Sequence, residues 1–312
     1  MDPVVVGLVL LSGVLHVTWN VRVKTGRDPL EATSVAVWTA TAVLVVPTLV
    51  GWVGLGRPPV TAEMAVLIVA SGLVGTIYFT LLSEAYRRGD LSLVYPTARG
   101  TSPILIAAIG VLLLGERLGP AGAWGVVALL AAILLLTRPW RALQAWSDRT
   151  PRTGAGTRPP MPAAVLALAT GFAIAGYTTI DRTGVRLDDG WLYAMLIWPA
   201  MSTGLIVVAM ARRRRAPTPV PRGSAGAWLR SAETRRAAVG GLFMLAGYLL
   251  VLYALAQAPQ AAVSPLRESA VVLGATWGAV VLGEATGRRD AGRRVAASAL
   301  VVVGVALLVL GG

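Results

Sequence analysis

Apolar segments of about twenty residues, separated by short polar stretches, recur along almost the entire chain. A helix needs roughly 20 mostly apolar residues to cross the hydrocarbon core of a bilayer. The pattern therefore predicts an all-α integral membrane protein with ten membrane helices. We expect these helices at 4–22, 32–53, 63–82, 91–114, 120–137, 162–180, 190–211, 237–256, 260–283 and 294–310.

Two of these segments are similar to each other. The stretch SPLRESAVVLGATWGAVVLGE aligns with YPTARGTSPILIAAIGVLLLGE when it is shifted by 168 positions, which places Arg267 on Arg99. A shift of 158 positions likewise places Tyr177 on Trp19. Two copies of five helices must insert in opposite senses, because five is an odd number. The sequence therefore predicts an inverted repeat with a binding site near the midplane, where the two copies meet.

The repeat divides the chain into three parts. The first five-helix unit is expected over residues 1–137 and the second over residues 162–312. The linker between them, 138–161, is rich in Arg, Pro and Gly, which is the composition of a solvated connection.

Composition excludes several classes of protein. Hydrophobic residues make up 55% of the chain and charged residues 14%, with a mean hydropathy of +0.69, whereas a soluble domain carries about 25% charged residues. The chain has no cysteine and one histidine, so we expect neither a metal site nor a cofactor. The net charge of +13 lies in loops rather than on one folded basic face, so nucleic acid is not an expected partner.

The distribution of positive charge predicts the orientation in the membrane. Of the 28 Lys and Arg residues, 22 fall in the loops that follow the first, third, fifth, seventh and ninth helices, and four fall in the other loops. Cytoplasmic loops carry an excess of Lys and Arg. We therefore expect the Arg-rich loops in the cytoplasm of a bacterial-type inner membrane, with both termini outside.

Arg267 and Glu268 place two charges inside an apolar segment. A charge at that depth costs about 2.5–3.5 kcal/mol and commonly marks a functional site. Neighbours on a helix point about 100° apart and pair poorly with each other. We expect Arg99 to pair with Glu268, which leaves donors on Arg267 for a carboxylate or phosphate of the substrate. The alternative is a structural network that ties the two helices together, or an arginine that extends to the membrane surface.

The first helix carries three further candidates on one face. His16, Trp19 and Asn20 are spaced so that they point in similar directions, and a polar face of a membrane helix must point toward the protein interior. We expect Trp19 and Asn20 to contact the substrate. Glu268 and His16 are the candidate carriers of a coupling proton, since histidine titrates near physiological pH. For His16 the alternative is a neutral ring that is hydrogen-bonded across helices.

Tyrosines supply candidates for the opposite wall of the cavity. Tyr177 corresponds to Trp19 in the repeat, and Tyr78 corresponds to Tyr248 if a short gap is allowed. Buried tyrosine hydroxyls need hydrogen-bond partners. Asp181 lies near the end of the same helix as Tyr177, where we expect a capping or rim role, with substrate contact as the alternative.

Two prolines and two glutamates have expected roles near the helix ends. Pro96 and Pro265 stand one turn or less before the two arginines and are candidate hinges, because proline frees a backbone carbonyl in a helix. A packing kink is the alternative. Glu116 and Glu284 are expected to stabilise the N-termini of the helices that follow them.

The repeat and several short motifs resemble the drug/metabolite transporter superfamily, and within it the ten-helix EamA-type members, over nearly the whole chain. The motifs are the paired LGE endings, the Tyr-Ala-Leu run at 253–255 and the prolines that begin the two related helices. The resemblance implies a secondary transporter or exchanger of small polar molecules, with a cavity lined mainly by the first, third, fourth, sixth, eighth and ninth helices.

The chain departs from these relatives in two respects. Ten-helix relatives are usually described with both termini in the cytoplasm, whereas the loop charges here predict the opposite. Four-helix multidrug relatives exchange protons through a glutamate of the first helix, and this first helix has no carboxylate.

We therefore expect a transporter of a small polar, acidic or zwitterionic metabolite, such as an amino acid, with a site between the helices at 4–22, 91–114, 162–180 and 260–283. A broad multidrug exporter is the alternative. An enzyme would need a nucleophile and base or metal ligands, and a channel would need rings of like groups; the sequence shows neither. The expected partners are the small-molecule substrate, the lipid bilayer and protons as coupling ion, for a monomer or a homodimer.

Overall fold

The computed structural model describes residues 1–24, 28–88, 91–138, 163–215, 231–280 and 287–310, with the isolated positions 140 and 144. Ten helices lie within these ranges, which confirms the predicted all-α fold. They are α1 (Pro3–Lys24), α2 (Pro29–Gly54), α3 (Ala62–Arg88), α4 (Leu91–Leu112), α5 (Pro120–Thr137), α7 (Ala163–Gly184), α8 (Gly190–Arg215), α10 (Ala232–Gln257), α11 (Gln260–Val280) and α12 (Arg288–Leu310).

Several helices begin or end beyond the apolar segment that predicts them. The helix α10 begins at Ala232, five residues before the predicted start, and Ser231 caps it by accepting a hydrogen bond from the backbone N–H of Thr234. The helix α12 begins at Arg288 rather than at 294. The hydropathy pattern identifies only the part of a helix that lies in the hydrocarbon core of the bilayer. A first turn that carries charged residues is therefore not included in the predicted segment. The predicted end of α11 at 283 lies outside the described residues.

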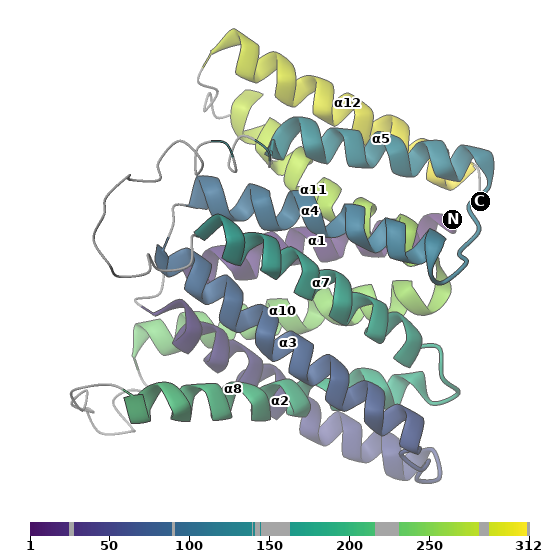
Figure 1. The fold of residues 1–312 in the computed structure, drawn as a ribbon. Coiled ribbons are helices and arrows are strands. Elements are labelled where there is room, and N and C mark those ends of the chain that lie inside the picture. Colours follow the sequence, from purple (N-terminus) through teal and green to yellow (C-terminus); the bar gives the residue numbers. More distant parts are fainter. Residues whose placement is uncertain are drawn as a thin grey trace.

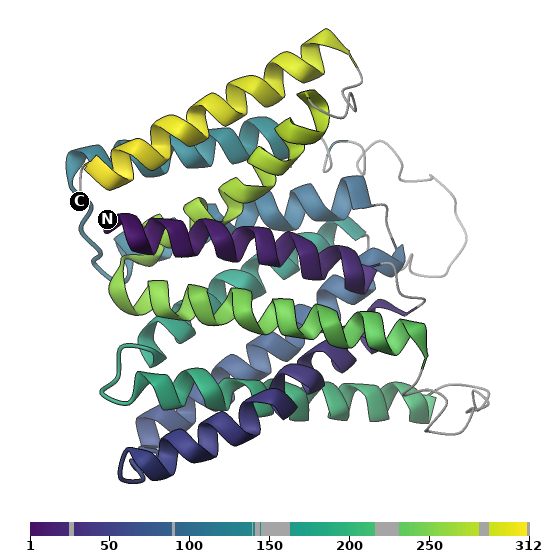
Figure 2. The same ribbon diagram turned by 180° about the vertical axis from the view of Figure 1, so that it is seen from behind.

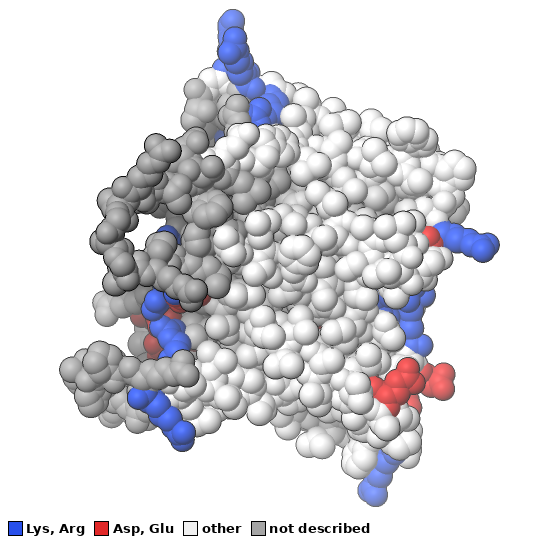
Figure 3. All heavy atoms as spheres, in the orientation of Figure 1, with Lys and Arg blue, Asp and Glu red and all other residues white. Residues whose placement is uncertain are grey.

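The surface of the bundle matches a protein that crosses the bilayer many times. Five described helices are long and apolar enough to span it by length and composition: α2, α3, α8, α10 and α12. Lys, Arg, Asp and Glu gather at two opposite ends of the face drawn in Figure 3, with a broad uncharged belt between them. Large apolar side chains such as Val66 and Val302 are 67% and 63% exposed, as expected where lipid replaces water.

The packing of the helices repeats when the two halves are exchanged. In chain order, α1 to α5 correspond to α7, α8, α10, α11 and α12. The helix α1 packs on α10 and α11, and its counterpart α7 packs on α3 and α4. The pairs α2 with α8, α4 with α11 and α5 with α12 each join a helix to its own counterpart, and Figures 1 and 2 show α5 beside α12 at one edge of the bundle. This pattern fits two inverted five-helix repeats.

The two termini lie at the same end of the bundle, which we call the terminus end (Figure 1). The amino group of Met1 donates a hydrogen bond of 2.7 Å to the carbonyl oxygen of Leu308. Because successive helices run in opposite directions, the turn between α4 and α5, the turn between α7 and α8 and the start of α11 also lie at this end.

The close approach of α10 to α2 depends on Gly241. A Cβ atom at this position would lie 2.3 Å from the carbonyl oxygen of Ala36. We expect Gly241→Val to separate the helices and to lower the free energy of unfolding by about 1–3 kcal/mol, the usual cost of overpacking. Denaturant unfolding in detergent measures this. The control is Gly7→Val, because an added Cβ there meets nothing within 4 Å; an equal loss in both variants would refute the packing argument.

Candidate functional site

A pocket lies between α1, α3, α7, α8, α10 and α11. Its empty volume is about 470 Å³, which includes space that is open to solvent. Its lining combines aromatic side chains with two charged groups. The lining residues are His16, Trp19, Ser71, Gly75, Tyr78, Phe79, Tyr177, Asp181, Trp198, Met201, Met244, Tyr248 and Arg267. The candidates Trp19, Tyr78, Tyr177 and Tyr248 are therefore brought together, whereas the side chain of Asn20 lies outside the described part of the chain.

The aromatic side chains form a continuous wall. The ring of Tyr177 lies 5.4 Å from that of Tyr78 and 6.0 Å from that of Tyr248, between ring centroids. The ring of Trp198 continues the wall at 6.1 Å from Tyr248. Trp198 comes from α8, which is the seventh helix in chain order. The family resemblance did not place the seventh helix around the cavity. Tilted and edge-on contacts of this kind hold aromatic rings in fixed orientations.

Arg267 brings a positive charge into the pocket. Its Nη2 atom lies 2.9 Å from Nδ1 of His16, and its Cζ atom lies 5.7 Å from the ring centroid of Tyr248. Its Nε atom is buried and has no hydrogen-bond partner. Among the described residues, no carboxylate lies within ion-pair distance of Arg267. Its guanidinium therefore keeps donors for an anionic group that enters the pocket.

Arg99 and Glu268 form the predicted ion pair. Nη1 of Arg99 lies 2.7 Å from Oε1 of Glu268, and both side chains are 6% exposed. This contact confirms the pairing between the two repeats, across α4 and α11. Neither residue is among those that line the pocket, but Arg99 contacts His16, which does. Their contact with substrate, and a proton-carrying role for Glu268, stay predictions.

His16 is surrounded by hydrogen-bond donors. Its Nδ1 atom faces Nε1 of Trp19 at 3.1 Å as well as Arg267, and its Nε2 atom contacts Nη2 of Arg99. A neutral imidazole offers one acceptor nitrogen, and a protonated one offers none. With Trp19 and Arg267 both donating to it, Nδ1 acts as an acceptor and carries no proton in this arrangement. A proton-carrying role for His16 stays a prediction, and it requires the arginines to move away when the proton arrives.

Asp181 is the functional candidate that sequence reasoning placed wrongly. It is 1% exposed and lines the pocket, so it neither caps α7 nor stands at the rim. Its carboxylate accepts hydrogen bonds from the hydroxyls of Ser71, Tyr193 at 2.6 Å and Tyr248. The only sequence signal was its position one turn after Tyr177. The donors come from α3, α8 and α10, and no local pattern brings them together.

The two candidate hinges lie inside helices. Pro265 is buried in α11, which continues through it to Val280. Position 96 lies within α4, and the side chain of Pro96 is outside the described residues. Motion at either position stays a prediction.

Comparison with known families decides the class of protein. The model of the EamA-like transporter family matches residues 4–138 and 161–310, which is one match for each half of the chain. The chain belongs to the EamA-like transporter family. This confirms the resemblance and makes the protein a multi-pass membrane transporter that acts on a small molecule.

A solved structure shares the fold of this EamA-type transporter. One chain of known crystal structure superposes with a TM-score of 0.67 at 21% sequence identity, and the match covers 99% of the transporter and 98% of that chain. At this identity the likeness concerns the fold alone.

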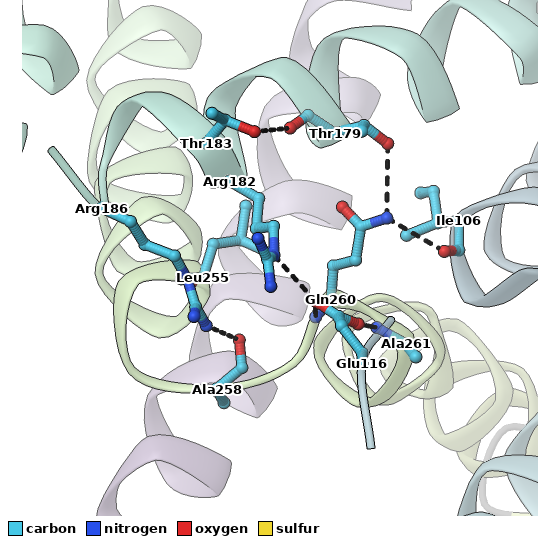
Figure 4. Close-up of polar contacts among 10 residues, drawn as sticks. All are labelled: Ile106, Glu116, Thr179, Arg182, Thr183, Arg186, Leu255, Ala258, Gln260 and Ala261. Carbon is cyan, nitrogen blue, oxygen red and sulfur yellow. Dashed lines mark hydrogen bonds and ion pairs between the residues drawn. The ribbon is translucent and has the colours of Figure 1, made fainter. Parts of the chain in front are cut away.

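At the terminus end of the transporter, Glu116 holds the start of α11 (Figure 4). Its Oε1 and Oε2 atoms accept hydrogen bonds of 3.0 Å from the backbone N–H groups of Gln260 and Ala261, and Oε1 also pairs with Nε of Arg182 at 2.8 Å. The sequence predicted that Glu116 stabilises the helix that follows it, α5. That prediction was wrong, because the carboxylate occupies the N-terminus of α11 instead. Glu284 lies outside the described residues.

Two more side chains extend this cluster to α4 and α10. Gln260 donates through Nε2 to the carbonyl oxygen of Ile106, at 3.1 Å. Arg186 donates through Nε and Nη2 to the carbonyl oxygens of Leu255 and Ala258, both at 2.9 Å. Figure 4 shows these contacts side by side. We call Glu116, Arg182, Arg186 and Gln260 the terminus-end cluster.

Proposed function

We propose that the protein is a secondary transporter of a small acidic or zwitterionic metabolite, such as an amino acid, and that the pocket around Arg267 is its substrate site. The observation that carries this proposal is Arg267 itself. Its guanidinium lines the pocket, and no carboxylate in the described part of the chain pairs with it. A guanidinium matches the geometry of carboxylate and phosphate groups, so an anionic group of the substrate completes the pairing.

We propose alternating access as the mechanism. The inverted repeat supports it, because two equivalent halves can rock around one central site. The terminus-end cluster supports a closed state at that end. Gln260 stands seven residues before Arg267 on α11, which at 1.5 Å per residue separates them by roughly 10 Å along the helix. Arg182 follows Asp181 directly on α7. Both α7 and α11 therefore carry residues of the pocket as well as a residue of the cluster.

The orientation and the coupling ion are part of the proposal. By sequence, 22 of the 28 basic residues fall in the connections that follow the first, third, fifth, seventh and ninth expected helices. This supports a cytoplasmic position for the end opposite the termini and an inner-membrane location. We propose protons as the coupling ion, with Glu268 or His16 as the carrier.

A multidrug exporter is the second candidate, and the aromatic wall favours it. Faces of tyrosine and tryptophan attract lipophilic cations. Arg267 opposes it, because a cation in the same pocket meets a positive charge. The two functions therefore predict opposite effects of removing Arg267.

Ligand-induced thermal stabilisation of the purified protein tests the proposal. The panel contains small acids, amino acids, organophosphates and lipophilic cations. A ligand at a hundredfold excess over its dissociation constant stabilises the folded state by about 2.7 kcal/mol. We expect an acid or amino acid to stabilise the wild type and to lose this effect in Arg267→Ala.

The control is Arg289→Ala, which removes an exposed charge from the start of α12 and should leave the stabilisation intact. Stabilisation by lipophilic cations that persists in Arg267→Ala would overturn the proposal in favour of multidrug export. A loss of folding in Arg267→Ala, with normal folding in Arg267→Lys, would assign the residue to the scaffold.

A further inference from the structure

We propose that Asp181 is the ammonium-binding group of the pocket, so that the substrates carry an amine as well as an acid. This inference rests on the proposed transport function and narrows its substrate class from acids in general to zwitterions. It assigns the negative pole of the site to a residue of α7 rather than to Glu268, which is engaged with Arg99.

In the described part of the chain, Asp181 is surrounded by hydrogen-bond donors but has no cationic partner. The residue is 1% exposed, and its carboxylate accepts hydrogen bonds from three hydroxyl groups, those of Ser71, Tyr193 and Tyr248. No Lys or Arg of the described ranges lies within ion-pair distance of it. A carboxylate has about four acceptor positions, so three hydroxyls leave one position open. A buried charge is costly unless it is paired, and a substrate ammonium supplies the missing charge.

Tyr248 sets the spacing between the two charged groups of the pocket. Its hydroxyl donates to Oδ2 of Asp181, while the face of its ring meets the guanidinium of Arg267 at 5.7 Å. The negative and positive groups therefore lie on two sides of one tyrosine and line the same pocket. A zwitterion has both complementary charges within one small molecule, and Tyr177 and Tyr248 offer ring faces that also favour an ammonium.

Other ligands satisfy only half of this arrangement. A simple carboxylate pairs with Arg267 but adds a negative charge beside Asp181. A lipophilic cation pairs with Asp181 but meets Arg267. Discrimination between a compound with an amine and its counterpart without one is therefore the property that Asp181 controls.

The test compares amino acids with 2-hydroxy acids of the same side chain, which replace the ammonium by a hydroxyl and keep the carboxylate. The probes are alanine, leucine, phenylalanine and glutamate, each with its 2-hydroxy acid, and affinities are measured by thermal stabilisation of the full chain. We expect at least one amino acid to bind the wild type about tenfold or more tightly than its hydroxy acid. Asp181→Asn keeps the size of the side chain but removes the charge and replaces one acceptor oxygen by an NH₂ donor. In this variant the two affinities should become equal within about twofold.

Tyr193→Phe is the matched control, since it removes one hydroxyl from Asp181 and leaves the carboxylate; the preference for the amine should remain. Equal binding of each pair by the wild type would overturn the inference even if Asp181→Asn does not fold. An amine preference that survives in Asp181→Asn would also overturn it and leave Asp181 as a link between α3, α7, α8 and α10. These outcomes differ from failure of the proposed function, in which no acid of either kind binds through Arg267.

Discussion

Replacing Arg99 by leucine should lower the free energy of unfolding by about 3–5 kcal/mol, because it leaves Glu268 as an uncompensated buried charge. The Glu268 side chain is 6% exposed, and within the described residues its carboxylate has Arg99 as its ion-pair partner at 2.7 Å. The pair joins α4 to α11, the two central helices that correspond in the repeat. Denaturant unfolding of the purified protein in detergent measures the loss.

The double variant Arg99→Leu/Glu268→Leu separates pairing from packing. Replacing both members of a buried ion pair by apolar residues is often nearly neutral, so the double variant should be more stable than either single one. The partly exposed pair Arg88 and Glu84, with side chains 33% and 27% exposed, is the matched control. Arg88→Leu should cost at most about 1 kcal/mol. A double variant that loses the sum of the two single losses would show that the charges act independently.

The same variants distinguish a purely structural role of the Arg99–Glu268 pair from a role in substrate binding. If the double variant folds but its pocket no longer binds the acid or amino acid, then Arg99 and Glu268 position Arg267 through His16, which contacts both arginines. If it folds and binds normally, the pair is a strut between α4 and α11, and the central site needs only Arg267 and the aromatic wall.

The sequence alone was sufficient to predict the helices, the repeat and the pairing of Arg99 with Glu268. The reason is physical. A bilayer forces every spanning segment to be long and apolar, so each helix leaves its own signal. A repeat relates residues that are far apart, which is why Arg99 could be matched with Glu268 across 169 positions. Both inferences use patterns that are written along the chain.

Asp181 and Glu116 were misplaced because their partners follow from packing alone. The hydroxyl of Ser71 lies 110 positions from Asp181, and no spacing rule links a serine of α3 to a carboxylate of α7. Glu116 was assigned to the helix that follows it, yet the N–H groups that it accepts from belong to a helix 144 positions away. A single carboxylate near a helix end indicates that an N-terminus is nearby, but not which one.

Replacing Glu116 by glutamine should open the terminus end of the transporter. The Glu116 side chain is 2% exposed and holds Arg182 of α7 and two backbone N–H groups of α11 with one carboxylate. Glutamine keeps the size but turns an NH₂ group toward donors and loses the charge that pairs with Arg182. Hydrogen bonds to a charged group contribute about 1.5–3 kcal/mol each, and about 1.4 kcal/mol shifts an equilibrium tenfold. The population open at this end should therefore rise about tenfold or more.

The chain has no cysteine, so a single introduced thiol reports on access to the pocket. Met201→Cys places it on the α8 side of the pocket, where the native residue is 7% exposed. A water-soluble thiol reagent applied from the terminus side should label Met201→Cys about tenfold faster when Glu116→Gln is also present. Glu63→Gln, an exposed acid in the first turn of α3 at the same end, should leave the rate unchanged.

An unchanged rate in a folded Glu116→Gln protein would mean that the terminus-end cluster is fixed scaffold, with the gate elsewhere. A faster rate carries a further consequence through α7. Asp181 and Arg182 are adjacent, so an ammonium that pulls on Asp181 also shifts the helix that carries the cluster's arginine. A zwitterion bound in the pocket should then alter the labelling rate in the wild type and have less effect in Glu116→Gln, because the contact that transmits the shift is already broken. That difference would identify the cluster as the element through which the pocket controls the terminus end.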